Sequence, residues 1–552
     1  MKHHLTLFAL CLSLSSISVP IKGQESQNVF IEIGSPGYAG LRTTQAERSR
    51  GILSKHLVEV NVQALRNGSS VQSVGVLDLT AKAGGSGEGF LMELPGGTVV
   101  TLETNRLHSY VDGVETYSGR VRDIGSGFFT LSIEDEKVYG QVNIEFIAYD
   151  LRYDNAFRSH LLTEVDLARL PKHAPDPLAS GTAAGSAPKG ANIPDAMSGS
   201  SNGTVRVLVL HGSDVSNVST LTSNIISKLN DTFFDDGMDA DLHVTLADIR
   251  NLNDDLDGVC KETILELMEE TDPPFANIAT WMSNEDADIV LTIATTDLGI
   301  TGCPVNQSYG RVGGQASFLL DSSRPYAVTM DTYAIGDLTA PHELGHVLGG
   351  AHPAWDNSQL NAASDNAAEP YSRGHIAGDG EWQTVMGSYD DNGCDFSTTL
   401  PNTDCVRLPL WSDPTKNYDG EARGVTFVSE TQVPYSADMV SALEIHMPTV
   451  AAWESYPYSA PGSISGIYVD RCYQHNIISW NSVTNAENYQ VVRSYSAGFT
   501  DPEVIYFSSQ TAMGVLIFQG YPTEYVKIRA CNGSGCGSYS SQLTLTYNPS
   551  CS

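Results

Sequence analysis

The amino-acid sequence predicts a multidomain α+β protein, and three observations support this fold class. The 552 residues exceed what one hydrophobic core ordinarily organises. In an N-terminal and a C-terminal region, apolar residues alternate with polar ones, as they do in half-buried β-strands. Between these regions, continuous apolar runs of strand length are interspersed with segments of helical periodicity. We therefore expect two mostly β units with an α+β unit between them.

Residues 1–23 are typical of a secretory signal peptide. Lys2 precedes an apolar run from Leu5 to about Val19, and small and polar residues follow at Gly23 and Gln24. The run is shorter than the ~20 residues that a membrane-spanning helix needs, and no later segment has that length and apolarity. We therefore expect a secreted, extracellular protein with no membrane span.

Residues 24–169 are expected to form a mostly β domain. Phe129, Leu131 and Ile133 alternate with polar residues, and Val142 and Ile144 repeat the pattern after a turn. From 170 to 203 the composition shifts to Pro, Ala, Gly and Ser, which cannot bury enough apolar surface to become ordered. A folded unit followed by a flexible linker, 170–203, is typical of a segment that is cut off after secretion.

Residues 204–455 combine strand and helix patterns. Two nearly continuous apolar runs predict buried strands, at Val205 to Leu210 and at Ile289 to Ala294. A short segment after Pro325, Tyr326–Met330, is expected to be an edge strand of the same sheet. Apolar residues at helical spacing predict an early helix on Leu221, Ile225, Leu229 and Phe233, and a closing helix on Met439, Val440, Leu443, Met447 and Val450.

The most informative segment, residues 342–352, has the pattern HExxHxxGxxH. On a helix, residues four apart share a face, so His342 and His346 present two imidazoles to one point. Leu344, Val347 and Leu348 lie on the opposite face and are expected to pack into a core. Gly349 and Gly350 can take the left-handed conformation that ends a helix, and the chain then turns back to place His352 beside the other two.

This set of side chains predicts a catalytic zinc site. His342, His346 and His352 would be the three metal ligands, which leaves a fourth position of Zn²⁺ open for water. Zinc lowers the pKa of such a water toward ~7, and Glu343 is placed to accept its proton as general base when a carbonyl is attacked. The pattern fixes five identities at set offsets, which arises by chance in a chain of this length with a probability on the order of 10⁻⁴ or less.

The segment resembles the zinc-binding signature of the metzincin metalloproteases. The resemblance implies a metzincin-type domain with a mixed twisted sheet, an active-site helix and a closing C-terminal helix. It also implies a methionine in a tight turn beneath the metal, and Thr384-Val385-Met386-Gly387 resembles that Met-turn, with Met386 as its apolar floor. In some metzincins a tyrosine two residues after the Met contacts the metal or the transition state; here Tyr389 follows by three.

Over residues 204–455 the wider resemblance is to reprolysin (adamalysin)-like bacterial proteases. The matching segments are 380–386, which lead into the turn, and 405–414, which follow it. Pro353, directly after the third histidine, is more similar to serralysins. By this resemblance, residues 24–169 would be a propeptide that keeps a zymogen inactive. They contain no cysteine, so latency would come from another zinc ligand or from steric cover.

The C-terminal region, residues 460–552, predicts a separate β-sandwich. Ile478-Ser479-Trp480, Tyr489-Gln490-Val491 and 525–530 alternate in strand fashion with turns between them. The region resembles a fibronectin type III domain, including a Cys531–Cys536 hairpin. Such domains more often act as spacers or adhesion modules than as catalysts.

The cysteines are consistent with disulfides in an oxidising compartment. Cys11 lies in the signal segment, and eight cysteines follow it, four in the middle region and four near the C-terminus. The preferred pairs are 394 with 405, 531 with 536, 260 with 303 and 472 with 551. Each group of four allows three connectivities, which the sequence leaves open.

The net charge of −34 disfavours nucleic acid and anionic membranes as partners. Acidic loops at 254–258 and 390–393 are weak candidates for structural Ca²⁺, because neither matches an EF-hand loop. The sequence therefore predicts a monomeric, secreted zinc endopeptidase acting on protein or peptide substrates. The alternative is a secreted adhesin with a relict zinc site, and the retained Glu343 disfavours it.

Overall fold

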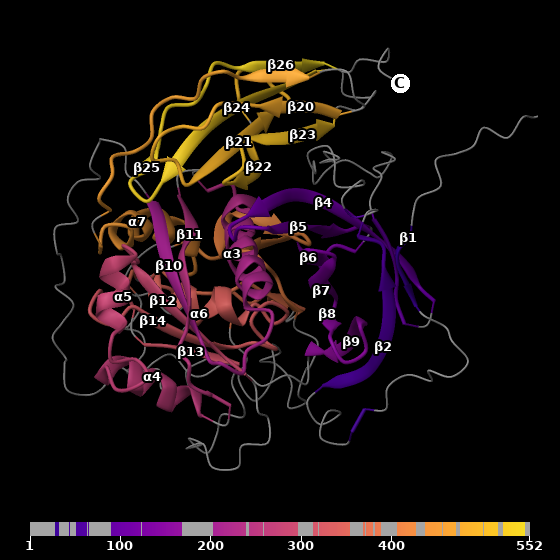
Figure 1. The fold of residues 1–552 in the computed structure, drawn as a ribbon, viewed down its shortest axis with the longest axis vertical. Helices are drawn as coiled ribbons and strands as arrows, with labels where there is room; N and C mark the ends of the chain where they lie inside the picture. Colours follow the sequence, from indigo (N-terminus) through magenta and orange to yellow (C-terminus); the bar gives the residue numbers. More distant parts are fainter. Residues whose placement is uncertain are drawn as a thin grey trace, which may run out of the picture.

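The structure is a computed structural model of the chain, and it contains three units (Figure 1). We call them the N-terminal unit (28–166), the middle unit (203–454) and the C-terminal unit (468–546). Helices and mixed sheets together confirm the α+β class. The described residues are 28–32, 43–44, 51–62, 65, 90–95, 97–122, 124–167, 203–238, 242–257, 259–295, 313–317, 319–353, 368–369, 371–378, 381–387, 406–426, 436–454, 456–470, 475–500, 502–516 and 523–546.

The N-terminal unit is a sheet that closes on itself. Its strands are β1 (Asn28–Glu32), β2 (Ile52–Val60), β3 (Phe90–Glu93), β4 (Val99–Ser109), β5 (Val114–Val121), β6 (Phe128–Glu134), β7 (Lys137–Ile144), β8 (Ile147–Asp154) and β9 (Ser159–Asp166). The sheet runs β4-β3-β1-β2-β9-β8-β7-β6-β5, and β5 also pairs with β4. Phe129, Leu131 and Ile133 are buried in its core, as their alternation predicts. A propeptide role for this unit stays a prediction.

The middle unit is built on a five-stranded sheet of order β11-β10-β12-β14-β13. The strands are β10 (Gly203–His211), β11 (Leu242–Asn251), β12 (Ile289–Ala294), β13 (Gly314–Ala316) and β14 (Tyr326–Met330). All neighbouring pairs are parallel except β13 with β14. The sheet is therefore mixed, and its buried central strands match the continuous apolar runs of the sequence.

The prediction that Tyr326–Met330 forms an edge strand is wrong. This segment is β14, and it lies between β12 and β13, with Gly314 opposite Thr329 and Ala316 opposite Ala327. The edge is formed by β13, which is antiparallel and only three residues long. Its residues, Gly, Gln and Ala, carry no apolar alternation, so the sequence pattern did not reveal it.

Helices cover both faces of this sheet, and each face has its own apolar core. On one face α3 (Val218–Asp235), α6 (Thr339–Val347) and α7 (Met439–Val450) pack on β10, β11 and β12. On the other face lie α4 (Lys261–Glu270) and α5 (Ile278–Asn284). Val207 faces the first core and Leu208 the second, so alternate residues of one strand stabilise both layers. The predicted helices on 221–233 and 439–450 are confirmed as α3 and α7, and Pro448 lies inside α7.

Short strands after α6 complete the middle unit. They are β15 (Trp382–Gln383), β16 (Val406–Arg407), β17 (Asp413–Tyr418) and β18 (Glu421–Arg423). β15 pairs with β16, and β17 with β18. They hold a small apolar cluster that includes Trp382 and Leu408, next to the segment that the sequence identifies with the Met-turn.

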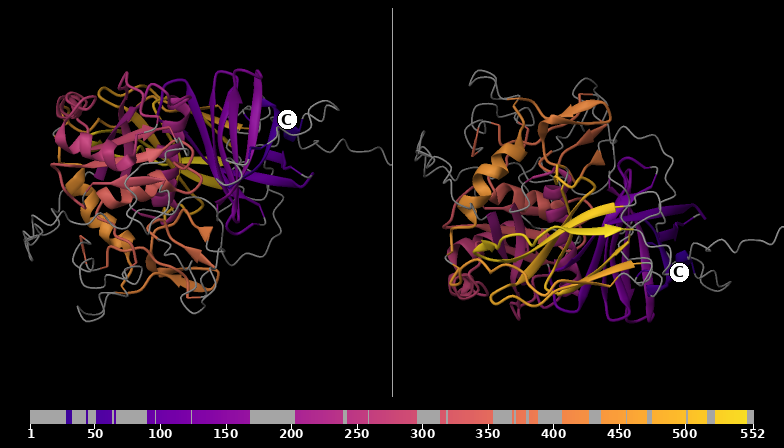
Figure 2. Two further views of the ribbon diagram at one scale, coloured as in Figure 1. Left: turned by 90° about the horizontal axis from the view of Figure 1, so that it is seen from below. Right: turned by 90° about the horizontal axis from the view of Figure 1, so that it is seen from above.

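The C-terminal unit is a two-sheet β-sandwich. Its strands are β19 (Tyr468–Asp470), β20 (His475–Ser479), β21 (Asn488–Ser494), β22 (Glu503–Ser508), β23 (Ala512–Leu516), β24 (Thr523–Asn532), β25 (Gly535–Cys536) and β26 (Leu543–Thr546). Strands β19, β20 and β23 form one sheet, and the core between the two sheets includes Trp480 and Tyr489. The two further views show this unit lying across the other two (Figure 2).

The C-terminal unit contacts both other units. Strand β22 pairs in parallel with β4 of the N-terminal unit, with Phe507 opposite His108. Arg206 on β10 forms a 2.8 Å ion pair with Glu487, and its guanidinium stacks on the ring of Tyr456 at 4.8 Å. In this structure the sandwich is therefore packed against the molecule through charge and strand pairing.

The predicted disulfide between Cys531 and Cys536 is confirmed. Cys260 is disulfide-bonded, and its predicted partner Cys303 lies outside the described residues. Cys394, Cys405, Cys472 and Cys551 also lie outside them, as do the signal segment 1–23 and linker residues 170–202. Gly203, assigned to the linker by composition, is the first residue of β10. Among the described helices, none has the length and apolarity to cross a membrane.

Candidate metal centre

Helix α6 places two of the three predicted ligands. It begins after Leu338, whose φ of 54° sets the direction of the chain, and it ends at Val347. His342 and His346 lie one turn apart on this helix and are both buried. Leu344, with Val347 and Leu348, packs into the core shared with α3, as the amphipathic pattern predicts. Packing of the apolar face therefore fixes the position of the helix, and the two histidines lie on its opposite face.

A glycine turn brings in the third predicted ligand. Gly349 has a φ of 99°, a conformation that side chains with a Cβ rarely adopt. Its N–H donates to His346 O, and the N–H of Gly350 donates to Gly345 O, each at 2.8 Å, which closes the last turn of the helix. The chain reverses, Ala351 bridges to Arg373, and His352 follows in a buried position.

The three imidazoles converge on one point. Their ring centroids are 4.7 Å (342 to 346), 5.0 Å (342 to 352) and 4.8 Å (346 to 352) apart. One nitrogen from each ring lies within 4.8 Å of the others, and the Nε2 atoms of His342 and His352 are 2.9 Å apart. Within the described part of the chain, this is the one group of three or more His, Cys, Asp or Glu that could hold a metal ion.

Backbone carbonyls fix the orientation of two of these rings. Nδ1 of His342 lies 2.7 Å from Val385 O, and Nδ1 of His346 lies 2.8 Å from Gly350 O. Because a carbonyl oxygen only accepts, these contacts favour the tautomer in which each Nδ1 carries the proton and each Nε2 is unprotonated. This tautomer is the one that presents Nε2 to a metal, and the outer hydrogen bonds hold the rings in place.

The donor set fits a zinc ion. Three neutral imidazoles suit Zn²⁺, and tetrahedral coordination at 2.0–2.1 Å would separate the ligand nitrogens by roughly 3.3 Å. The observed spacing of the nitrogens brackets that separation. Three protein ligands also leave one coordination position for a substrate or water, which is typical of catalytic sites.

Glu343 follows His342 on α6 and is buried. Its side chain packs against edge strand β13, since a Cβ added at Gly314 would come within 2.7 Å of Glu343 Cγ and 2.6 Å of Thr339 Cγ2. Glycine at this position therefore lets the edge strand approach the carboxylate. The structure thus brings together a buried acid, an edge strand and the three imidazoles.

Met386 lies against α6, where the Met-turn prediction puts it. The turn is closed by a 2.8 Å hydrogen bond from Gly387 N–H to Thr384 O, and Met386 is fully buried. A Cβ on Gly345 would overlap the sulfur of Met386, so a glycine in α6 gives the sulfur room below the helix. Its role as the floor of the site stays a prediction. Tyr389 lies outside the described residues.

Trp411 also packs against α6, and its backbone is hydrogen-bonded to the buried carboxylate of Asp236. The Trp411 ring stacks on Phe233 with centroids 5.8 Å apart, and its backbone N–H donates to Asp236 Oδ2 at 2.7 Å. Asp236 also pairs with Arg423. Burial raises the pKa of Asp236 to about 6, against the opposing charge of Arg423. This network joins the end of α3 to the strands that follow the Met-turn.

Two buried arginines near the site were not predicted from the sequence. Arg373 Nη1 donates to His352 O at 3.1 Å, which fixes the backbone of the third histidine. Arg407 donates to Asp337 O at 3.1 Å and to Gly387 O at 2.7 Å, which joins the loop before α6 to the Met-turn. Both act through backbone carbonyls, which have no residue-specific signal in the sequence.

The acidic loop at 254–257 does not form a second group of possible metal ligands among the described residues. Asp254 and Asp255 accept hydrogen bonds from backbone N–H groups of the next residues in the same loop. These bonds stabilise a turn, and no group of three ligands includes this loop among the described residues. The second candidate loop, 390–393, lies outside the described residues.

No family model matches the chain. The chain is similar to a peptidyl-Asp metalloendopeptidase of Stenotrophomonas maltophilia, with 25% identity over 287 residues, which covers 50% of this chain and 60% of that protein. The match thus spans less than two thirds of the relative. Among solved structures, metalloproteinase-II from Bacteroides fragilis has 11% identity and a TM-score of 0.28, covering 52% of this chain and 88% of that one. An Fn3-like protein from Clostridium thermocellum has 22% identity and a TM-score of 0.15, covering 16% of this chain and 96% of that one. Neither TM-score is high enough to define a shared fold.

Proposed function

We propose that the protein is a secreted zinc endopeptidase of the metzincin type that hydrolyses peptide bonds in extracellular proteins. The observation that carries the proposal is the convergence of three buried imidazoles next to a buried glutamate. The similarity to a named metalloendopeptidase supports it. The reprolysin-like subfamily and the fibronectin-like identity of the C-terminal unit remain parts of the proposal that rest on sequence resemblance.

His342, His346 and His352 would hold the zinc, and Glu343 would transfer the proton. When bound, zinc supplies a Lewis acid that polarises a carbonyl and makes water nucleophilic at neutral pH. Glu343 is the group positioned to take the proton of the attacking water and to return it to the leaving amine. Because Glu343 is buried, its proton transfers take place shielded from bulk solvent.

Strand β13 is the best candidate to align the substrate. It is the edge of the middle sheet, it is antiparallel to β14, and it passes beside Glu343 at Gly314. An extended peptide could add to this edge by main-chain hydrogen bonds, which would hold the scissile carbonyl next to the acid. The edge position that the sequence assigned to Tyr326–Met330 thus belongs to β13.

The remaining parts of the proposal concern secretion and latency. The apolar segment after Lys2 supports secretion, and the N-terminal unit followed by a Pro/Gly/Ser-rich linker supports a zymogen. The expected form is a monomer carrying a single zinc.

Hydrolysis of casein or gelatin with and without a chelator tests the proposal. We expect purified protein, after its N-terminal unit has been cut off and then dissociated or degraded, to hydrolyse these substrates, to lose activity with 1,10-phenanthroline and to regain it with added zinc. Chelator-insensitive hydrolysis would indicate a different catalytic group. Folded protein that holds zinc but hydrolyses no protein would favour the alternative, an adhesin whose metal site is a relict.

A further inference from the structure

The N-terminal unit covers α3, and the covered face of the helix is polar. Strands β4, β5, β6 and β7 contact α3, while Ile225, Leu229 and Phe233 of the same helix point into the middle core. The buried polar residues of α3 include Thr222, Ser223, Asn224, Ser227, Lys228 and Asp231. Such a face is compatible with water, so if the N-terminal unit left, the middle unit would expose mainly polar groups here, apart from the apolar surface that Phe128 of β6 covers.

Neutral hydrogen bonds align the two units. Thr116 Oγ1 lies 2.7 Å from Ser223 Oγ, and Ser132 Oγ donates to Asn224 Oδ1 at 2.7 Å. Asn143 Nδ2 donates to Gly336 O at 2.7 Å, in the loop that leads to α6. Each bond is buried, so breaking it without water would leave an unsatisfied polar group.

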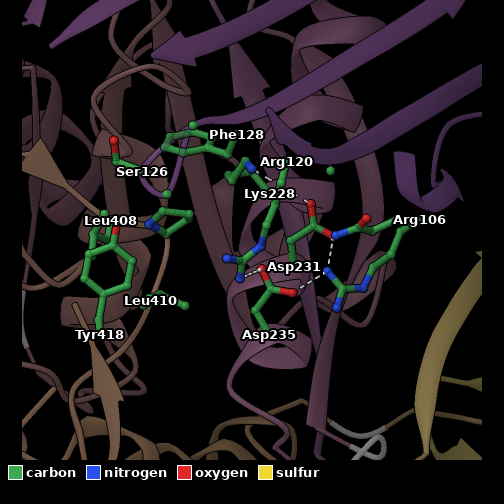
Figure 3. A pocket seen from close by; sticks show the side chains of 15 residues that line it. Arg106, Arg120, Ser126, Phe128, Lys228, Asp231, Asp235, Leu408, Leu410 and Tyr418 are labelled. Atoms are coloured by element: carbon green, nitrogen blue, oxygen red, sulfur yellow. Dashed lines mark hydrogen bonds and ion pairs between the residues drawn. The ribbon is translucent and has the colours of Figure 1, made fainter. Parts of the chain in front are cut away.

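A cluster of charges lies at the centre of this contact (Figure 3). Arg106 on β4 lies 2.7 Å from Asp235 and 3.5 Å from Asp231, and His108 lies 3.0 Å from Asp231. Arg120 on β5 approaches Asp235 at 3.8 Å. Burial opposes the charge of Asp231, but the hydrogen bond and charge of His108, together with Arg106, outweigh it and lower the pKa of Asp231 to about 2. The anions come from α3, and the cations come from the N-terminal unit except for Lys228 of α3, which lies 4.0 Å from Asp231.

The end of β4 also contacts the C-terminal unit. Residues 107–109 pair with β22 of the C-terminal unit, and Tyr110 lies 5.4 Å from the ring of Phe507. Phe507 also contacts His243 of the middle unit at 4.7 Å. Removing β4 would leave the edge of β22 unpaired and Phe507 uncovered, and both changes cost free energy.

We propose that the N-terminal unit stays bound as a separate chain after the linker is cut, with Asp231 and Asp235 of α3 as its recognition site. This inference rests on the proposed propeptide role, because that role is the reason for a cut in the linker. Scission breaks none of the described contacts between the units and removes only the high effective concentration that a tether provides. Activation would then need a second event, either dissociation or further degradation of the N-terminal unit.

Site-specific cleavage of the full chain tests the inference. A recognition sequence for a site-specific protease is inserted between residues 170 and 202, in a Glu343→Gln background that prevents self-digestion. After cleavage, gel filtration at micromolar concentration is expected to show both fragments eluting together. Asp231→Asn is expected to raise the dissociation constant at least roughly 30-fold, since it removes the carboxylate that pairs with buried His108 and one of the two carboxylates that face buried Arg106.

Asp248→Asn is the matched control. Asp248 pairs with Arg250 at 2.9 Å on the surface of the same unit, outside the contact, so its loss should not change the dissociation constant. If Asp231→Asn prevents folding of the uncut chain, Arg106→Gln probes the same pair from the other side. The inference is overturned if the cut wild-type fragments separate at micromolar concentration, or if Asp231→Asn, or Arg106→Gln in its place, binds as tightly as the control. The readout is association, so it is independent of whether the protein proves to be a peptidase.

Discussion

Glu343→Gln is expected to lower the kcat of peptide hydrolysis by about 10²–10⁴-fold, the contribution of a positioned general base. Glutamine keeps the size of the side chain next to Gly314 and Thr339 but has no basic oxygen that can take a proton from water. The three histidines are unchanged, so zinc content should stay the same. Steady-state kinetics on a fluorogenic peptide, combined with metal analysis of the same sample, would measure both quantities.

The control for this substitution is Glu369→Gln, which alters a carboxylate of the same unit near His446, outside the three-histidine group. It should leave kcat within a few-fold of wild type. Wild-type turnover in the Glu343→Gln protein would exclude Glu343 as the base and would direct attention to another acceptor near the histidines.

His352→Ala is expected to weaken zinc binding by more than about 100-fold, since replacing even an outer hydrogen-bonding partner of a ligand costs 10–100-fold. It removes one of the three predicted ligands, and among the described residues no fourth His, Cys, Asp or Glu belongs to the group. Hydrolysis should fall to background at limiting zinc. Competition with a chromophoric chelator would give the dissociation constant.

The matched variant is His446→Gln, which changes another buried histidine of the middle unit. Burial lowers the pKa of His446 to about 4, so this ring is neutral in the folded protein and is expected to have a packing role. Its replacement should reduce the thermal stability and leave the zinc dissociation constant unchanged. Equal zinc affinities for the His352→Ala and wild-type proteins would mean that the third imidazole is not a ligand.

The three-histidine group could be predicted from the sequence because its geometry is local. His342 and His346 are fixed relative to each other by one helical turn, and Gly349 supplies the one backbone conformation that returns His352 to them. No contact from a distant part of the chain was needed for that prediction. The same holds for α3 and α7, whose apolar spacing is a property of each helix alone.

The rest of the site depends on contacts between distant segments. Strand β13 was missed because its three residues have no alternation and its position comes from pairing with β14. Arg373 and Arg407 were missed because their partners are backbone carbonyls of His352, Asp337 and Gly387, which any residue type provides. Neither property leaves a pattern in a single sequence.

The contact between units was also hidden from the sequence. Arg106 and His108 belong to a strand whose alternation indicates only one inward and one outward face. That β4 also pairs with β22, and that Asp231 lies opposite Arg106, follows from how three units pack. The polar residues of α3 were equally compatible with a solvent-exposed face, and for this reason the sequence did not predict their burial.

The most direct test of the central claim is the zinc content of the purified, folded wild-type protein. Inductively coupled plasma mass spectrometry on protein dialysed against metal-free buffer should find about one zinc per chain, and none after all three histidines are replaced. Folded wild-type protein without stoichiometric zinc, or equal zinc in the triple variant, would contradict the assignment of His342, His346 and His352 as a metal centre.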